Sequence, residues 1–262
     1  MTVEFENARA LIIELDEAFP GTQSLIVGGA VRDFLMSIPC SDVDIATNVP
    51  FDQLAQRFEL RDITKSTINA QPVSVIHYNG FAFEIAAFRA DSAGVEGRGN
   101  NAPVIVGSFH EDAARRDITI NAMGINSKNQ VVDPVYGRTD LMNNVVRAVG
   151  IPAMRFREDA TRILRVFRFA AKFNFDIEED TLQAAKHNKW RLLDREQISP
   201  ESIAKEFYKA ASDGPLLSRF IMLLQDAGIL SDLLPEFTAM EGFTHDNFYH
   251  PEGAMVRKIL KA

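Results

Sequence analysis

Cysteine is almost absent from this 262-residue chain: Cys40 is the only one, and a single thiol cannot form an internal disulfide. The five histidines and this cysteine show no zinc-type spacing, which excludes a structural zinc site of the Cys/His kind. The N-terminal turns carry acidic residues rather than a basic head, and no long apolar run follows, so we expect neither a signal peptide nor a membrane span. These absences predict a cytoplasmic protein with no membrane contact and no disulfide partner.

The chain also lacks an excess of positive charge, since its net charge is −8 and its sequence pI is about 5.2. Such a balance excludes a surface that is basic all over, as in non-specific nucleic-acid binders. One stretch, 147–172, departs from this trend with seven basic residues against two acidic ones. Its basic residues are Arg147, Arg155, Arg157, Arg162, Arg165, Arg168 and Lys172. This polarity predicts one cationic binding groove on an otherwise acidic body.

Hydrophobic residues make up 46% of the chain, which is enough for a sizeable core in one large domain or two modest ones. Short apolar strands alternate with short helices in the first part of the chain, and longer amphipathic helical patterns follow. We therefore expect an α+β head over residues 1–150 and a helical remainder over residues 151–262, with the boundary at Gly150 and Pro152.

The clearest local signal is the segment 73–88, VSVIHYNGFAFEIAAF, in which two alternating strands flank Asn79-Gly80, a favoured two-residue hairpin turn. This turn sets a register in which Val75 lies opposite Glu84. The larger apolar residues of the second strand share one face, while Glu84 lies on the other face among alanines. A carboxylate in such surroundings indicates a functional role.

A double glycine follows the apolar strand SLIV, and a short helix follows the glycines. Gly28 and Gly29 thus occupy a strand-to-helix turn whose backbone N–H groups favour a phosphate, with Arg32 one turn further along as a charged donor. The segment has neither the G-K-[ST] of a Walker A loop nor the G-x-G-x-x-G of a dinucleotide turn. It predicts a phosphate-binding turn of another kind.

Asp42 and Asp44 lie two residues apart on the strand pattern DVDIAT, so both carboxylates face the same side. Two close carboxylates raise each other's pKa unless a cation lies between them. Oxygen ligands without histidine or cysteine favour Mg²⁺, and Glu84 could supply a third oxygen. A D-x-D pair alone is more often a solvated turn and a helix cap. Its place near the glycine turn favours a joint site for metal and phosphate, as phosphoryl or nucleotidyl transfer requires.

GGAVRD and DVDIAT together resemble the signature of the class II tRNA nucleotidyltransferases and bacterial poly(A) polymerases, in the DNA polymerase β superfamily. Three further segments resemble the next motifs of that family in the right order: RRDITINAM, DPVYGRTDL and REDATRILRVFRFAAKF. The resemblance extends over residues 22–205. It implies a polymerase-β-type head, with a mixed sheet and helices, followed by a helical neck and partial body.

The resemblance also implies roles for individual residues. Asp42 and Asp44 match the ligands of the catalytic magnesium ions, and Glu84 matches the third carboxylate. Gly29 and Arg32 match contacts to the triphosphate. The segment that holds the sugar and phosphates of the nucleotide is matched by Arg116, Asp117 and Asn121.

The last motif predicts one helix that starts near Glu158 and carries a basic stripe beside a core-facing apolar stripe. Asp159 and Arg162, three residues apart on this helix, lie side by side. They form either a salt bridge on a solvated face or a pair that imitates a base. In the second case the carboxylate accepts from the amino group of C or A and the guanidinium donates to the ring acceptor, whereas G and U are excluded. The resemblance implies this protein-template role, and Arg165 and Arg168 match further nucleotide contacts.

These features predict a Mg²⁺-dependent, template-independent nucleotidyltransferase that adds CCA to the 3′ end of tRNA from CTP and ATP and releases pyrophosphate. A poly(A) polymerase, or an enzyme that adds only A or only CC, remains open within the family. An RNA-binding factor with a vestigial site and a small-molecule nucleotidyltransferase remain open as well, although the latter leaves Asp159 and Arg162 unexplained.

Three segments depart from the family pattern. The loop at 91–109 has Glu96 where an aspartate is usual, and it lacks the usual histidine and proline. Ser202 stands where the neck motif usually has arginine. The segment 243–262 resembles the start of an HD-type domain, but a metal-dependent phosphohydrolase needs more ligands than the ones present, His245, Asp246 and His250.

Overall fold

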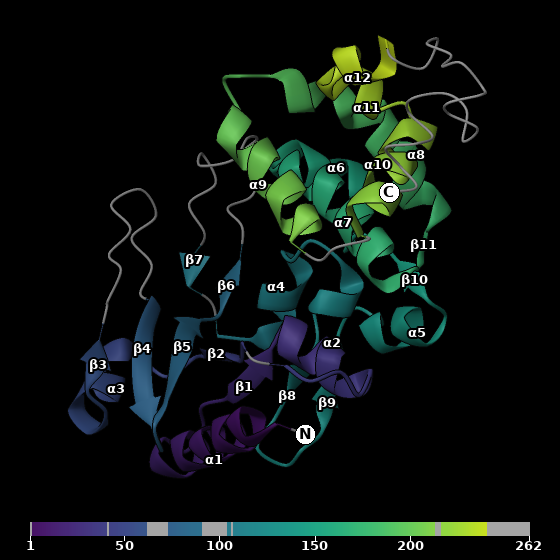
Figure 1. Ribbon diagram of the computed structural model, residues 1–262. Coiled ribbons are helices and arrows are strands. Elements are labelled where there is room, and N and C mark those ends of the chain that lie inside the picture. Colours follow the sequence, from purple (N-terminus) through teal and green to yellow (C-terminus); the bar gives the residue numbers. More distant parts are fainter. Residues whose placement is uncertain are drawn as a thin grey trace. The chain divides into compact units, whose positions relative to one another are not determined.

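The computed structural model describes residues 2–40, 42–61, 73–90, 104–105, 107–212 and 216–239. The described chain divides into two compact units: unit 1 ends at Asn143 and unit 2 begins at Asn144 (Figure 1). This division falls a few residues before Gly150, where the sequence pattern changes. The divergent part of the 91–109 loop, with Glu96, and the HD-type segment both lie outside the described residues.

Seven short strands form the sheet of unit 1: β1 (Ser24–Val27), β2 (Asp44–Thr47), β3 (Leu60–Arg61), β4 (Val73–Tyr78), β5 (Phe81–Ala87), β8 (Gly124–Ile125) and β9 (Val131–Val132). Their order in the sheet is β3-β4-β5-β2-β1-β8-β9. β2 and β5 are parallel, and the other neighbours are antiparallel. All four residues of β1 are buried, because this strand lies inside the sheet and packs against helices.

The β4–β5 hairpin has the register that its Asn79-Gly80 turn predicts. Val75 lies opposite Glu84 across the pair. Phe83 is buried on the core face, whereas Glu84 is exposed on the other face. The alternation along β5 therefore places this carboxylate at the surface of the sheet, as we expected.

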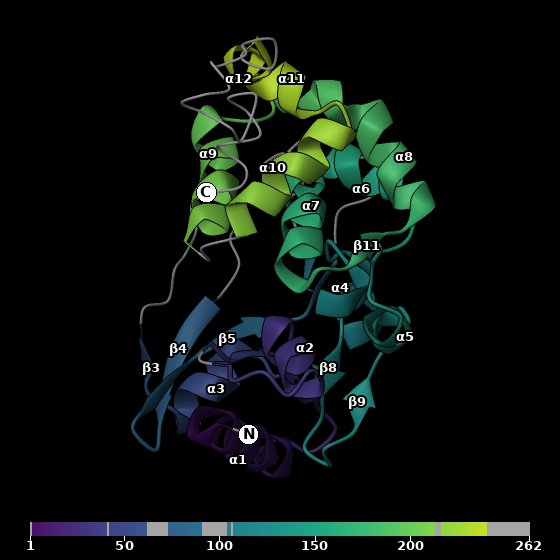
Figure 2. The same cartoon turned by 45° about the vertical axis from the view of Figure 1, so that its right-hand side comes forward.

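The helices of unit 1 are α1 (Val3–Ala18), α2 (Gly29–Leu35), α3 (Phe51–Arg57), α4 (Phe109–Ala114), the 3₁₀ turn η1 (Thr119–Asn121) and α5 (Gly137–Met142), with a small strand pair of β6 (Arg89–Ala90) and β7 (Val104–Ile105). The hydroxyl of Thr2 caps α1 by accepting from the Phe5 N–H. Phe5, Leu11 and Leu15 are among the residues that α1 buries as it packs against β1 and β5. Figure 2 shows the same helix alongside the sheet from a second direction.

Unit 2 consists of β10 (Val145–Val146), α6 (Pro152–Glu158), α7 (Thr161–Phe173), β11 (Asp176–Ile177), α8 (Glu179–Asn188), the 3₁₀ segment η2 (Lys189–Leu193), α9 (Pro200–Ala211), α10 (Leu216–Asp226), α11 (Leu230–Leu233) and α12 (Pro235–Ala239). α7 is its central helix and packs against α6, α9 and α10. Its predicted apolar stripe, including Ile163 and Phe167, is buried. The helical remainder thus has the expected character, apart from the parallel pair of β10 and β11. No helix within the described ranges has the length and apolar character that crossing a membrane requires.

The expected placement of Asp159 on the helix that carries Arg162 is wrong, because that helix begins only at Thr161 and a separate short helix precedes it. α6 ends at Glu158, Asp159 is extended with φ −151° and ψ 103°, and α7 begins at Thr161. The carboxylate of Asp159 accepts from the backbone N–H of Thr161 at 2.9 Å and from its hydroxyl at 2.5 Å. These local side-chain bonds satisfy the first turn of α7 and compete with a continuous helix. Asp159 therefore precedes the helix that carries Arg162.

Candidate active site

The glycine turn of unit 1 lies against two arginine side chains. Gly28 has φ +75°, a conformation that favours glycine, and it joins β1 to α2. A Cβ atom on Gly28 would lie 3.2 Å from Nη1 of Arg116, and a Cβ atom on Gly29 would lie 3.4 Å from Nη2 of Arg32. The absence of side chains at both glycines therefore leaves room for two guanidinium groups beside the turn.

Asn121 connects these two arginines. Its side-chain oxygen accepts from Nη1 of Arg32 at 2.5 Å, and its backbone oxygen accepts from Nη1 of Arg116 at 3.2 Å. Arg32 is buried and also donates to the Asp33 carboxylate through Nε and Nη2. The structure thus brings together Gly28, Gly29, Arg32, Arg116 and Asn121. Asp117, adjacent to Arg116, is buried.

The register of the sheet places the acidic residues beside the glycine turn. Asp44 starts β2 and lies opposite Val27, the last residue of β1 before the turn. Ile45 lies beside Ile85 in the parallel pair of β2 and β5, so the preceding residues, Asp44 and Glu84, are neighbours. Long-range pairing of strands therefore joins two carboxylates that are 40 residues apart in the sequence.

The environment of Asp44 shows that three carboxylates lie within electrostatic reach of one another. Burial, and then the charges of Asp42 and Glu84, raise the pKa of Asp44 from 3.8 to about 6, while Arg116 opposes the shift. Part of each of these three carboxylates is nevertheless exposed to solvent. The site thus holds negative charges that repel one another, with a guanidinium nearby.

This group of carboxylates has the donor chemistry of a hard cation site. Within the described ranges, no three or more His, Cys, Asp or Glu side chains are spaced as a ready-made set of metal ligands, so Glu84 does not complete a closed three-ligand cage with Asp42 and Asp44. The residues nevertheless fit Mg²⁺, which binds proteins through one or two carboxylates and keeps several waters. A cation between Asp42 and Asp44 would also relieve the repulsion that, after burial, raises the pKa of Asp44.

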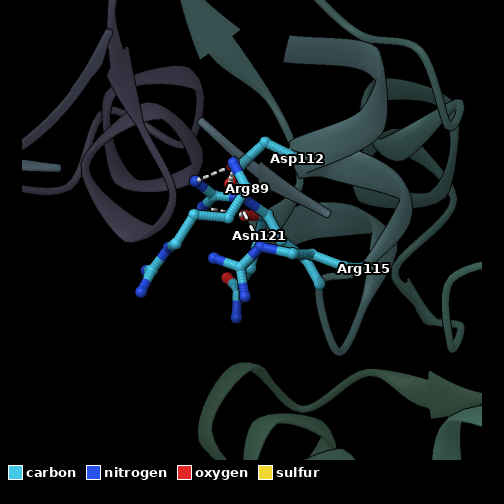
Figure 3. Close-up of polar contacts among 5 residues, drawn as sticks. Arg89, Asp112, Arg115 and Asn121 are labelled. Carbon is cyan, nitrogen blue, oxygen red and sulfur yellow. Dashed lines mark hydrogen bonds and ion pairs between the residues drawn. The ribbon is translucent and has the colours of Figure 1, made fainter. Parts of the chain in front are cut away.

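The structure adds residues that our sequence reasoning missed: Arg89, Asp112 and Arg115. Figure 3 shows these side chains gathered together with Asn121. Asp112 is buried in α4 and accepts from Arg115 and Arg116 and from the backbone of Arg89. Asp112 lies three residues before Arg115 and four before Arg116, a spacing typical of ion pairs along a helix, so this part of the cluster could have been predicted from the sequence. The contact with Arg89, 23 residues earlier, depends on the tertiary fold.

The DPVYGRTDL motif supports the turn that carries Asn121. Asp133 accepts from the backbone N–H groups of Gly137 and of the next residue, at 2.8 and 2.9 Å, and so begins α5. Gly137 packs so closely that a Cβ atom there would overlap the carbonyl oxygen of Thr119. The hydroxyl of Thr119 in turn donates to Asp140 at 2.7 Å. Both Thr119 and Asp140 are buried, so this motif fixes η1 from behind.

The other predicted nucleotide contacts belong to unit 2. Arg162 donates to Glu158 at 2.7 Å from the start of α7. Arg168 is buried, forms a 2.7 Å ion pair with Glu206 of α9, and stacks on a phenylalanine ring. Arg165 is half-buried and lies over the same ring. Arg168 is therefore part of the packing between α7 and α9, a role that the sequence reasoning missed.

Comparisons with known proteins agree with this architecture. Residues 24–147 match the family model described as the poly A polymerase head domain. A CCA-adding enzyme of Pediococcus pentosaceus is 39% identical over 80% of this chain and 51% of its own length. The crystal structure of the Bacillus stearothermophilus CCA-adding enzyme in complex with CTP matches with a TM-score of 0.73, at 31% identity over 87% of this chain and 53% of that one.

A further solved structure, of a CCA-adding enzyme with ATP, matches with a TM-score of 0.68 at 25% identity, over 90% of this chain and 53% of that one. The chain spans about half the length of the relatives it matches. These similarities confirm the predicted fold, a polymerase-β-type α+β head followed by helices, and the predicted family resemblance.

Proposed function

Because the chain belongs, through residues 24–147, to the poly A polymerase head-domain family, we propose that it is a tRNA nucleotidyltransferase that adds C and A to the tRNA 3′ end from CTP and ATP. Pyrophosphate would be the second product. The CCA-adding enzymes among its relatives support this choice over a poly(A) polymerase. With tRNA as acceptor, we place the protein in the cytoplasm.

The observation that carries the proposal is the juxtaposition of Asp44, Glu84 and Arg116 beside the glycine turn. Carboxylates at the start of β2 and on the neighbouring strand β5 suit a metal-assisted attack by an RNA hydroxyl. Arg116 uses three of the five N–H groups of an arginine for described partners, so donors remain for a phosphate. The site therefore combines a negative side for a cation with a positive side for a triphosphate.

Magnesium is the cofactor that we propose, with Asp42 and Asp44 as its protein ligands and Glu84 as a nearby third carboxylate. When bound, it would lower the pKa of the RNA hydroxyl and neutralise phosphate charge. Around it, Arg32 and Arg116 would hold the triphosphate through charge-assisted hydrogen bonds, and Gly28 and Gly29 would let the phosphates approach the backbone. Asp117 and Asn121 would position the nucleotide's sugar and phosphates from the segment after α4.

We propose further that Asp159 and Arg162 select the base, with Arg165 as a phosphate contact. Asp159 precedes α7 rather than lying on it, and its carboxylate already accepts from Thr161. Both Thr161 donors bond Oδ1 of Asp159, and an ionised carboxylate has about four acceptor positions on its two oxygens, so the two bonds from Thr161 do not by themselves prevent it from accepting an exocyclic amino group. Glu158 accepts a hydrogen bond from Nη1 of Arg162 and so orients its guanidinium.

The test uses three tRNA transcripts that end before CCA, after C and after CC, each incubated with single nucleotides and Mg²⁺. Ordered addition of C, C and A that then stops supports the proposal, whereas addition of A alone or C alone identifies a partial enzyme. Untemplated A runs on any RNA indicate a poly(A) polymerase. If the wild type extends no transcript and binds no nucleotide with Mg²⁺, the chain is an RNA binder with a vestigial site and the proposal is wrong.

A further inference from the structure

One buried carboxylate, Asp112, accepts four N–H hydrogen bonds at the edge of the candidate site. Its Oδ1 accepts from the backbone of Arg89 and from Nε of Arg115, both at 3.1 Å. Its Oδ2 accepts from Nε of Arg116 at 3.1 Å and from Nη2 at 2.8 Å. Only 1% of Asp112 is exposed, so protein donors replace water at both oxygens.

The groups around Asp112 explain why it stays ionised. Burial alone would raise its pKa, but the charges of Arg116 and Arg115, together with the hydrogen bonds, hold the pKa below its ordinary value. In the same cluster, burial and then the charge of Arg115 lower the pKa of Arg89, while Asp112 opposes this shift. Two guanidinium groups, those of Arg115 and Arg116, thus pair with Asp112, while Arg89 bonds it through the backbone and interacts electrostatically with the same cluster.

The geometry ties this cluster to the glycine turn. Arg116 donates three hydrogen bonds: Nε and Nη2 donate to Asp112, and Nη1 donates to the Asn121 backbone oxygen. The same Nη1 lies beside Gly28. Without Asp112, the guanidinium could rotate toward the negative charge of Asp44, with which it already interacts. Such a pair would occupy both the metal side and the phosphate side of the site.

We propose that Asp112 is a positioning residue, which holds Arg116 in the orientation that receives the phosphates of the substrate. The inference rests on the proposed function, because it assumes that Arg116 binds a triphosphate. Asp112 itself does not touch the substrate, since its oxygens are buried and occupied by protein donors. Two adjacent hydrogen bonds fix the plane of the Arg116 guanidinium, which a single charge contact would not do.

The experiment measures binding of inorganic tripolyphosphate, by calorimetry, and steady-state kinetics on tRNA with the full chain. Asp112→Asn keeps the shape of the side chain but replaces an acceptor with an amide donor that faces arginines. We expect tripolyphosphate to bind about ten- to a hundred-fold more weakly, and KM for CTP and ATP to rise by a similar factor, with a smaller change in kcat. Glu111→Gln removes the same charge from an exposed neighbour in α4 and should leave both values unchanged.

A double-mutant cycle separates positioning from a general loss of stability. If Asp112 acts through Arg116, Asp112→Asn should weaken binding little further once Arg116→Gln is present, whereas additive losses would overturn the proposal. Should Asp112→Asn fail to fold, Arg116→Lys tests the same ion pair through Arg116, the partly exposed partner. Lysine keeps the charge but cannot form the paired bonds, so wild-type tripolyphosphate affinity in this variant would also overturn the proposal.

The controls distinguish this inference from the proposed function. If the wild type binds tripolyphosphate and extends tRNA, and Asp112→Asn has the same affinity and KM, the positioning role is refuted and the proposed function is not. A wild-type chain that neither binds tripolyphosphate nor extends tRNA refutes the proposed function, and the inference falls with it.

Discussion

Replacing Asp44 by asparagine should make the folded protein more stable while it abolishes nucleotide addition. The folded state raises the pKa of this carboxyl from 3.8 to about 6, so the fold disfavours its ionised form. Asparagine has nearly the same shape and no charge, and it removes the repulsion from Asp42 and Glu84. A residue whose removal stabilises the protein is retained for function rather than for folding.

The magnitude follows from the size of the shift. About two pKa units correspond to ~3 kcal/mol when the carboxyl is fully ionised. Because part of Asp44 is exposed, solvent screens the repulsion, and we expect about 1 kcal/mol of stabilisation in the variant. For a chain of this size, that change corresponds to a rise in Tm of about 2–4 °C.

The sign of the pH dependence gives a second check. Between pH 3.8 and about 6 the folded state binds more protons at Asp44 than the unfolded state does, so the contribution of this group to stability falls as pH rises through that window. The advantage of Asp44→Asn should therefore be complete above pH 6 and should disappear as pH approaches 4. At the low end of this pH window, the Asp44 carboxyl of the folded wild type is neutral, as asparagine is in the variant.

The assay is thermal unfolding at pH 7.5 and pH 4 without divalent cations, with Asp52→Asn as a charge-matched control. Asp52 is an exposed acid in the first turn of α3, where a negative charge is favourable, so its loss should not raise Tm. Added Mg²⁺ should raise the Tm of the wild type more than that of Asp44→Asn. A lower Tm for Asp44→Asn at pH 7.5, or an equal gain at both pH values, would refute the reasoning.

Three further substitutions test other parts of the structure. Gly137→Ala should destabilise unit 1 by about 3 kcal/mol in urea unfolding, because the new methyl group overlaps the Thr119 carbonyl. Gly107→Ala, at an open position, is the control. Equal urea midpoints for the two variants would contradict this account of the packing. Arg168→Met should cost about 3 kcal/mol, because the buried Glu206 loses its 2.7 Å partner and keeps the longer 3.7 Å contact to Lys209. Glu206→Leu in the same chain should recover most of this loss, which a role of Arg168 limited to nucleotide binding does not predict. Asp159→Ala should relax the preference for C and A over U in extension assays while tripolyphosphate affinity stays within about two-fold; unchanged selectivity would exclude this residue as the base reader.

Features that depend on neighbouring residues could be predicted from the sequence. The Asn79-Gly80 turn fixes the hairpin register by local backbone geometry, and so the exposed position of Glu84 followed from the pattern. The glycine turn and Arg32 likewise follow from a strand, two glycines and a helix in succession. Conversely, the break at Asp159 was missed, because helical spacing does not reveal that a side chain caps the next helix.

Features that depend on distant residues could not be predicted in this way. Arg168 has the spacing of a stripe residue, but its partner, Glu206, lies 38 residues further along in another helix. The pairing of β2 with β5 brings Asp44 beside Glu84, and the sequence contains no signal for that choice of neighbours. The family resemblance supplied what local patterns lacked, since it implied that these acids act together.

The charges of the candidate site are kept apart by separate partners, and this separation explains how a site can hold metal ligands and phosphate donors together. Arg32 is paired with Asp33, and Arg116 with Asp112, so each of these two guanidinium groups has a carboxylate partner that is not part of the metal side. Burial, and then the charges of Asp42 and Glu84, raise the pKa of Asp44 to about 6 although Arg116 opposes this shift, so the arginine offsets only part of it. If the arginines lacked these partners, the opposite charges would pair with each other, and both a cation and a triphosphate would have to break those pairs before binding. Holding each charge in place before the ligands arrive removes that reorganisation from the reaction.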